Sequence, residues 1–256
     1  MIYVDGAQKS GSGTIVRFAV GLATLLGEEL HLINIRAKRE KPGLRPQHLK
    51  AIQALQQICQ GSLDGGEIGS KEIRFNPGGR EVRGGHYEWD IGTAGSTSLL
   101  VMTLLPAACF SKGAISFKIS GGLFQDFAPS AYHMQYILFP MLNKMGISAE
   151  LNIIRPGYVP RGGGVIKVVV EPVTGKIKPI RLPNQGDVVR IGGIALSSHL
   201  KEKRVSERMM KKCNEVLKSN GYRAQIDIVH DTLALQRGAA LAIYARTSSG
   251  CVIGAD

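Results

Sequence analysis

Residues 87–105 read YEWDIGTAGSTSLLVMTLL, and this order of residue types decides the fold. Tyr87 to Ile91 reads as a strand, small and polar residues follow, and apolar residues then recur at helical spacing to about Cys109. Residues 3–26, YVDGAQKSGSGTIVRFAVGLATLL, have the same order: a short strand, a glycine-rich loop and an amphipathic helix. Two such units in one chain predict an internal repeat.

The elements that follow each unit extend the repeat to βαβαββ. The first half continues with a strand at 29–35, a helix at about 47–60 and strands near 68–75. The second continues with a strand at 114–119, a helix at about 129–145 and strands at 149–154 and 164–170. We therefore predict an α/β (α+β) fold whose large domain, residues 1–182, contains two repeats at about 1–80 and 86–172.

A different pattern begins after a linker rich in proline and glycine at 179–186. Residues 188–196 read as a strand, 201–219 as a strongly basic helix, and 224–230 and 239–246 as two further strands. This βαββ order predicts a smaller inserted domain at 183–248. Residues 249–256 are interpreted as the start of a third, incomplete repeat.

Composition indicates a globular protein with polyanionic partners. The chain has 256 residues, 44% of them hydrophobic, and a formal net charge of +12. Lysines scattered over the surface would give the same total charge, so the charge favours nucleic acid only statistically. No apolar run has the length of a membrane span, no signal peptide is visible, and the four cysteines are far apart. We expect a cytoplasmic protein with reduced thiols and no membrane partner.

The most informative segment is NIRAKREKPGLRPQH at 34–48. It places several cations after a strand, on a loop stiffened by two prolines that leads into a helix. Arginine forks suit phosphate oxygens, whereas lysine acts as a point charge. A solvated basic loop is the alternative interpretation. His48 stands at the end of this segment, and we interpret it as a structural first-turn histidine rather than a catalytic one.

The glycine loops are candidate anion sites, because a helix that begins at Gly and Ser has free backbone N–H groups. Gly11-Ser12-Gly13 lacks both the P-loop pattern and the third glycine of the dinucleotide fingerprint, so a tight turn is the alternative. Arg17 lies one helical turn further on. The glycines at 162–164 can likewise serve close approach to a ligand or a hairpin turn.

These segments together resemble RNA 3′-terminal phosphate cyclase. The resemblance rests on DGAQ at 5–8, GSG at 11–13, Arg17 and the stretch RAKREKPGLRPQHL at 36–49. GTAGS at 92–96, SGG at 120–122, AP at 128–129 and GYVPRGGG at 157–164 follow in the family's order. It covers essentially the whole chain.

The resemblance implies repeated units similar to the C-terminal domain of translation initiation factor 3, with a smaller inserted domain. Family members use ATP and a divalent metal, Mg²⁺ or Mn²⁺, to adenylylate a histidine. The AMP then passes to an RNA 3′-phosphate, and the adjacent 2′-OH displaces it to give a 2′,3′-cyclic phosphate. A phosphate oxygen leaves poorly until it is capped as a pyrophosphate, which explains the need for ATP.

Residue by residue, the resemblance assigns roles that support catalysis to Arg17, Arg36, Arg39 and Gln47. The phosphate- and nucleotide-binding candidates are Gln8, Gly11, Ser12, Gly13, Gly95, Ser96, Pro129 and Gly163. No metal ligand is assigned. The expected partners are ATP and an RNA 3′ end, with a homodimer as an open alternative.

Three departures from the family pattern stand out. Ser10 replaces a glutamate of the first loop, and Leu123-Phe124 replace Thr-Asp after Ser-Gly-Gly. The family's nucleophilic histidine belongs to a segment beyond Asp256, which suggests either a fragment or a degenerate gene product. We accordingly expect the 256-residue chain alone not to form the covalent enzyme–AMP intermediate.

Two other functions stay open at this point. One is a non-catalytic, cyclase-like RNA-binding protein that works in ribosome assembly or RNA processing. The other is an enolpyruvyl-transfer enzyme, which shares similar repeats but is disfavoured by the inserted unit and by the 36–49 stretch.

Two geometric expectations follow. Arg17, Arg36, Arg39 and the Gly11 to Gly13 loop should open on one cleft with Gln47 nearby. The cations of the 201–218 helix can track an RNA backbone, although a solubilising surface is the simpler interpretation.

Overall fold

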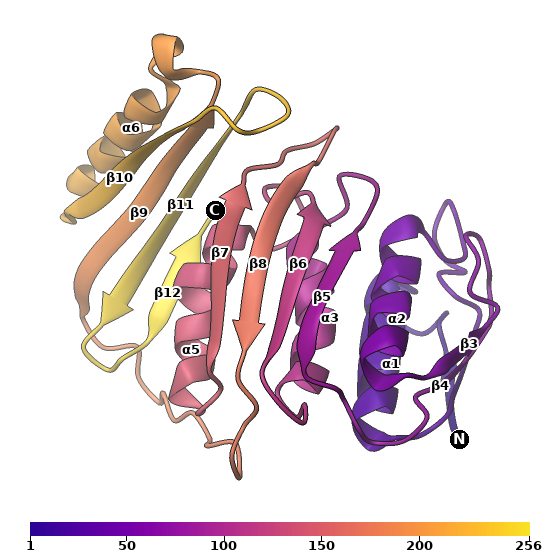
Figure 1. Ribbon diagram of the computed structural model, residues 1–256. Coiled ribbons are helices and arrows are strands. Elements are labelled where there is room, and N and C mark those ends of the chain that lie inside the picture. Colours follow the sequence, from indigo (N-terminus) through magenta and orange to yellow (C-terminus); the bar gives the residue numbers. More distant parts are fainter.

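The computed structural model describes residues 1–256 and contains three four-stranded sheets. Each sheet has one parallel pair and two antiparallel pairs of strands. The sheets follow one another along the molecule, from the N-terminal unit to the smaller C-terminal unit (Figure 1). The mixed α/β class predicted from the sequence is confirmed.

The first repeat comprises β1 (Ile2–Asp5), α1 (Gly13–Leu26), β2 (Leu30–Ile33), α2 (Pro46–Cys59), β3 (Ser62–Asp64) and β4 (Ile73–Asn76). Its strand order is β1-β2-β4-β3. Of the strands expected near 68–75 only β4 lies there; β3 comes earlier in the chain, and a loop separates the two. Gly65 allows the turn, because its φ is +73° and a Cβ there would lie 2.6 Å from the Glu72 carbonyl oxygen.

The second repeat has the same connectivity. It comprises β5 (Gly85–Asp90), α3 (Thr97–Ala108), β6 (Ile115–Gly121), α4 (Ala131–His133), the π-helical turn η1 (Met134–Leu138), α5 (Phe139–Lys144), β7 (Ala149–Arg155) and β8 (Gly164–Val170). Its order, β5-β6-β8-β7, matches that of the first sheet strand for strand. The helix expected at 129–145 is divided by the π turn, which precedes Pro140, a residue without an N–H for regular α-helical bonding.

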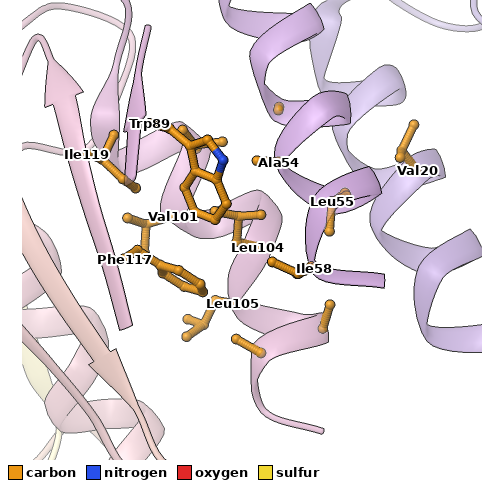
Figure 2. Close-up of a cluster of buried hydrophobic side chains, with 14 of the residues drawn as sticks. Val20, Ala54, Leu55, Ile58, Trp89, Val101, Leu104, Leu105, Phe117 and Ile119 are labelled. Carbon is orange, nitrogen blue, oxygen red and sulfur yellow. The ribbon is translucent and has the colours of Figure 1, made fainter. Parts of the chain in front are cut away.

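Both repeats share one hydrophobic core of 38 buried residues. Helix α3 lies between the two halves, and nine of its twelve residues are buried, so its apolar character extends around the helix. Figure 2 shows Leu104 and Leu105 of α3 between Ile58 of α2 and Phe117 of β6. The large unit is therefore a single packed body.

The smaller unit comprises β9 (Val188–Ser198), the 3₁₀ turn η2 (Lys201–Lys203), α6 (Val205–Ser219), β10 (Ala224–Asp231), β11 (Gly238–Thr247) and β12 (Val252–Ala255). The basic helix begins at Val205 because Arg204, with φ +49°, breaks the helical path from the preceding turn. Strand β12 pairs with β11, so residues 252–255 extend this sheet, whereas the sequence interpretation placed them in a third repeat.

An aromatic seam joins the two units. It consists of Phe124, Tyr132, Tyr136, Tyr158 and Tyr244, with neighbouring ring centroids 5.0–6.1 Å apart. Tyr136 stacks on Tyr244 at 5.0 Å, and the Tyr158 hydroxyl is 2.9 Å from Ser198 Oγ. These contacts cross from the second repeat to the smaller sheet and fix their relative position.

All four cysteines are free thiols, two of them buried and two half-buried. None of the helices combines the length and the apolar character that crossing a membrane requires.

Candidate functional site

The site is built around His48, which is buried in the first turn of α2. Its Nδ1 accepts the Arg45 backbone N–H at 3.3 Å and helps to cap the helix. Its Nε2 packs against Gly13 so closely that a Cβ there would overlap the imidazole ring. The glycine loop and the 34–48 segment are thereby joined at two helix starts. His48 thus lies in the first turn of α2, where the sequence predicts it, and makes a capping contact there.

Three arginines surround this histidine. Burial, and then the positive charges of Arg17, Arg36 and Arg45, lower the pKa of His48 to about 3. Arg39 is close to Arg36, whose own pKa is lowered by burial and by the charges of Arg45 and Arg39. We call Arg17, Arg36, Arg39 and Arg45 the arginine cluster. None of the four forms an ion pair with a carboxylate, so their charge is available to a polyanion.

Arg36 also shapes the loop that carries the cluster. Its backbone adopts φ +53°, and Nη1 donates to the carbonyls of Lys41 at 2.6 Å and Gly43 at 2.9 Å. Its Nε and Nη2 donate no hydrogen bond within the protein. One edge of the guanidinium thus holds the loop while the other remains open to a ligand.

The glycine loop contacts the arginine loop directly. Lys38 Nζ donates to the Lys9 carbonyl at 3.0 Å, and a Cβ at Gly11 would lie 3.1 Å from Lys38 Cβ. Ser12 caps α1 through Thr14, and Gln8 lies exposed in the turn that its carbonyl closes with the Gly11 N–H. Lys38 and Arg45 were not among the predicted site residues, although both lie in the segment that the sequence singled out.

The second glycine loop, residues 92–96, lies beside the segment that carries the arginine cluster. A Cβ at Gly95 would be 3.3 Å from Gln47 Cβ, so Gln47 bridges the two repeats. Ser96 caps α3 through Leu99, and its neighbour Ser98 donates to the Pro129 carbonyl at 2.5 Å. The structure therefore brings Gln47, Gly95, Ser96 and Pro129 into one series of contacts.

First-turn N–H groups are bonded at both helix starts. At α1 the Thr14 N–H donates to Ser12 Oγ at 3.4 Å and the Ile15 N–H to the Ser12 carbonyl at 3.2 Å. At α3 the Thr97 N–H donates to the Gly122 carbonyl at 3.0 Å and the Leu99 N–H to Ser96 Oγ at 3.2 Å. Two first-turn donors are thus used within the fold. The α1 and α3 starts therefore differ in their surroundings, with the arginine cluster beside α1, and not in the number of bonded donors.

Gly163 lies at the joint between the units rather than at the arginine cluster. Its carbonyl accepts Arg155 Nε at 2.7 Å, and a Cβ would overlap Leu235 of the smaller unit. Its neighbour Gly162 is the closer one to the second glycine loop: a Cβ there would lie 2.8 Å from Ala94 Cα.

A hollow of about 770 Å³ opens beside Pro129, between the 124–130 loop and β11. Its walls are mostly apolar and include Phe124, Tyr132 and Ala240. Gln125 Oε1 is buried without a hydrogen-bond partner. This oxygen lies against Gly122, and Asp126 and Asp256 also line the hollow. Mostly apolar walls with a few polar groups are typical of a site for a flat ligand.

Comparison with known proteins gives this arrangement a context. A family model described as RNA 3′-terminal phosphate cyclase matches residues 8–252. The chain belongs to this family. It is 36% identical to the RNA 3′-terminal phosphate cyclase of Staphylothermus marinus, over 100% of this chain and 72% of that protein. Its identity to the Pyrococcus furiosus protein of the same name is also 36%, over 96% of this chain and 71% of the relative.

The cyclase family resemblance inferred from the glycine loops and the 36–49 stretch is thus confirmed, as is the general enzyme class. The structure adds the spatial order of the motifs. The arginine cluster and Gly11 to Gly13 lie at one helix start, Gln47 connects them to Gly95, and Ser98 connects that loop to Pro129.

Proposed function

We propose that this chain binds ATP and an RNA 3′-terminal phosphate. Together with the nucleophilic histidine that the family resemblance places outside residues 1–256, it converts that phosphate to a 2′,3′-cyclic phosphate through adenylylated intermediates. The observation that carries the proposal is the arginine cluster: four cations without carboxylate partners, beside a glycine loop that opens a helix. Preorganised cations at such a site bind phosphate groups and stabilise the charge that develops during phosphoryl transfer.

In the first step the histidine attacks the α-phosphorus of ATP, a nitrogen–phosphorus bond forms and pyrophosphate leaves. An oxygen of the RNA 3′-phosphate then attacks the same phosphorus, the bond to the histidine breaks, and the RNA end carries AMP. The ribose 2′-OH then attacks the RNA phosphorus, AMP leaves, and the hydroxyl proton is released. The products are the cyclic phosphate, AMP and pyrophosphate. Neutral His48 adds no further positive charge to this site, because its pKa is near 3.

We assign the phosphates to the arginine cluster and the adenine to the hollow beside Pro129. The apolar walls fit the faces of a base, and the carboxylates of Asp126 and Asp256 in the same lining can accept from its exocyclic amine. No three His, Cys, Asp or Glu side chains are grouped so that they could hold a metal. Mg²⁺ commonly relies on substrate phosphates and waters, so ATP would supply most ligands to Mg²⁺ or Mn²⁺.

The test uses RNA labelled on its 3′-phosphate. In a protein that includes both residues 1–256 and the nucleophilic histidine, ATP with Mg²⁺ or Mn²⁺ should make the label resistant to phosphatase while AMP and pyrophosphate accumulate. Arg17→Gln and Arg39→Gln should each lower the rate by roughly 100-fold, because removing one charge-stabilising donor has effects of that order. Arg74→Gln is the matched control, since Arg74 is an exposed arginine of β4 outside the cluster. Equal rates for all three variants would contradict the assignment.

One observation favours the second candidate, a cyclase-like RNA-binding protein without activity. Leu123 and Phe124 occupy the positions of Thr-Asp in the family pattern. Leu123 is buried and Phe124 belongs to the aromatic seam, so both side chains contribute to packing. Tight binding of 3′-phosphorylated RNA with no cyclic product would decide for this function.

A further inference from the structure

The smaller unit carries much of the positive charge of the protein. Residues 188–255 contain eleven Lys and Arg against five Asp and Glu, about half of the total net charge of +12. The question is whether this charge is spread over a solvated surface or is placed toward the site of the large unit.

Some of these cationic side chains line a hollow of about 380 Å³ at the C-terminal ends of β9 and β10. Lys201, Lys203 and Arg237 line this hollow, together with Glu202 and Asp231. The three cations are exposed and none forms an ion pair. Two carboxylates share the lining: Asp231 accepts the N–H groups of Leu233 and Ala234, both at 3.0 Å, and Glu202 forms no ion pair, so cations outnumber anions by three to two. We call this feature the cation hollow.

Arg161 connects the cation hollow to the large unit. Its Nη1 donates to the Leu235 carbonyl at 3.3 Å and its N–H to Gln236 Oε1 at 3.2 Å. These acceptors immediately precede Arg237 in the chain. Gln236 Nε2 returns a hydrogen bond to the Val159 carbonyl at 2.7 Å. The β7–β8 loop and the β10–β11 loop are thereby held together with both arginines near their junction.

The same β7–β8 loop leads on to the arginine cluster. Gly162 lies against Ala94, Gly95 lies against Gln47, and Gln47 is adjacent in sequence to His48 at the centre of the cluster. Figure 1 shows these loops at one end of the molecule, where β5, β7 and β9 finish. A continuous series of contacts therefore runs from the arginine cluster, past Arg161, to the cation hollow.

From this continuity we propose that the single-stranded RNA upstream of the reacting end crosses the joint between the units, with its phosphates held by Arg161, Arg237, Lys201 and Lys203. The proposal rests on the proposed function for the location of the 3′ end. Leu233 and Leu235 are 63% and 50% exposed beside these cations and provide apolar surface for unstacked bases. Contacts of this kind recognise the backbone without reading sequence.

The experiment measures binding of three ligands as a function of salt: a dinucleotide with a 3′-phosphate, a 15-nucleotide RNA with the same end, and that RNA ending in a 3′-OH. The long RNAs should bind more tightly. Lys203→Glu combined with Arg237→Glu should weaken both long RNAs roughly 10-fold at ~0.1 M salt and reduce the salt slope by about 1 to 2. The dinucleotide should lose much less affinity.

The matched control reverses two cations at the opposite end of the smaller unit, Lys218→Glu with Arg223→Glu. Lys218 is in the last turn of α6, about 20 Å from its start at 1.5 Å per residue. The control should retain the affinity and salt slope of the wild type. Melting curves establish that both double variants are folded.

Three outcomes would overturn the proposal: equal affinity for dinucleotide and long RNA, equal losses in the two double variants, or polyglutamate competing as effectively as RNA. The last would assign the hollow to an acidic polypeptide. A different result would contradict only the proposed function: the double variant weakens the 3′-OH RNA as expected, but the 3′-phosphorylated RNA binds no more tightly than the 3′-OH RNA. The proposed path of the RNA across the joint would then still hold.

Discussion

At the residue scale, the site depends on what is missing from Gly13. Because Gly13 lacks a Cβ, the His48 ring can pack on the start of α1 and bring the two loops together. Gly13 does not have a positive φ, so backbone conformation does not require a glycine at this position. The close approach of the His48 ring does.

Gly13→Ala should therefore destabilise the protein by about 1–3 kcal/mol, the usual cost of overpacking a tight contact. Its Cβ would overlap the His48 ring, which cannot move without losing the hydrogen bond to Arg45. Gly113→Ala is the control, because nothing lies within 4 Å of a Cβ there. Urea unfolding curves compare the two. A loss of stability that is as large in the control would contradict the packing argument.

His48 also predicts a dependence of stability on pH. Its pKa is about 3 in the folded protein against an ordinary value of 6.5, so between these values the unfolded chain binds more protons. The contribution is fully present above pH 6.5 and is lost as the pH falls toward 3. From pH 6.5 to 4.5 this amounts to about 2 kcal/mol, at ~1.4 kcal/mol per pKa unit.

The measurement is urea unfolding at several pH values in wild type and His48→Gln. The variant should be less stable at pH 7 but lose less stability on acidification, because carboxylates titrate equally in both proteins. Parallel pH profiles would show that His48 is protonated in the folded state.

At the element scale, the corresponding helices α1 and α3 start from similar sequences but serve different purposes. Helix α3 has its first turn bonded to Gly122 and Ser96 and is buried between the two halves. Helix α1 begins beside the arginine cluster, with His48 packed against Gly13. The two helices of the repeat therefore differ in environment: the first starts beside the arginine cluster, and the second is packed in the core.

Ser96→Ala tests this structural role. Ser96 is 2% exposed, and its Oγ accepts the Leu99 N–H and contacts Ser98 Oγ, so its removal should cost about 1–2 kcal/mol. Ser219→Ala, at the exposed end of α6, should change stability by less than ~0.5 kcal/mol. Thermal unfolding followed by circular dichroism distinguishes them. A neutral Ser96→Ala variant would leave Ser96 available for a ligand.

At the scale of the whole molecule, the aromatic seam couples the smaller unit to the large one. Tyr158 is central to it, because its ring packs on Phe124 and on Gly238 while its hydroxyl reaches Ser198. The same contact keeps the β7–β8 and β10–β11 loops together, so the seam also sets the geometry of the proposed RNA track.

Tyr158→Ala should remove about 3 kcal/mol of stability and separate the melting of the two units, as expected for a large aromatic side chain lost from a buried contact. Trypsin should then cut faster at Lys176 and Arg181, which are exposed in the segment between β8 and β9. Tyr222→Ala is the control, since Tyr222 is 44% exposed on the smaller unit. Unchanged proteolysis in Tyr158→Ala would mean that the seam does not couple the units.

Much of this protein was determined by the sequence alone. The spacing of apolar residues and the positions of glycine loops predict nearly every helix and strand, because both are local properties of the sequence. The repeat followed from two similar strand–loop–helix units, and the family followed from the 36–49 stretch. Arg17, Arg36, Arg39 and Gln47 could be singled out because charge and spacing are visible in the chain.

Only the tertiary structure decided which groups meet. The packing of His48 on Gly13, the contact of Gln47 with Gly95 and the position of Gly163 at the joint depend on contacts between segments far apart in the chain. The pairing of β12 with β11 and the use of the α3 donors by Gly122 are equally non-local. Local propensity cannot specify such contacts, because their free energy comes from surfaces that exist only after the chain has folded.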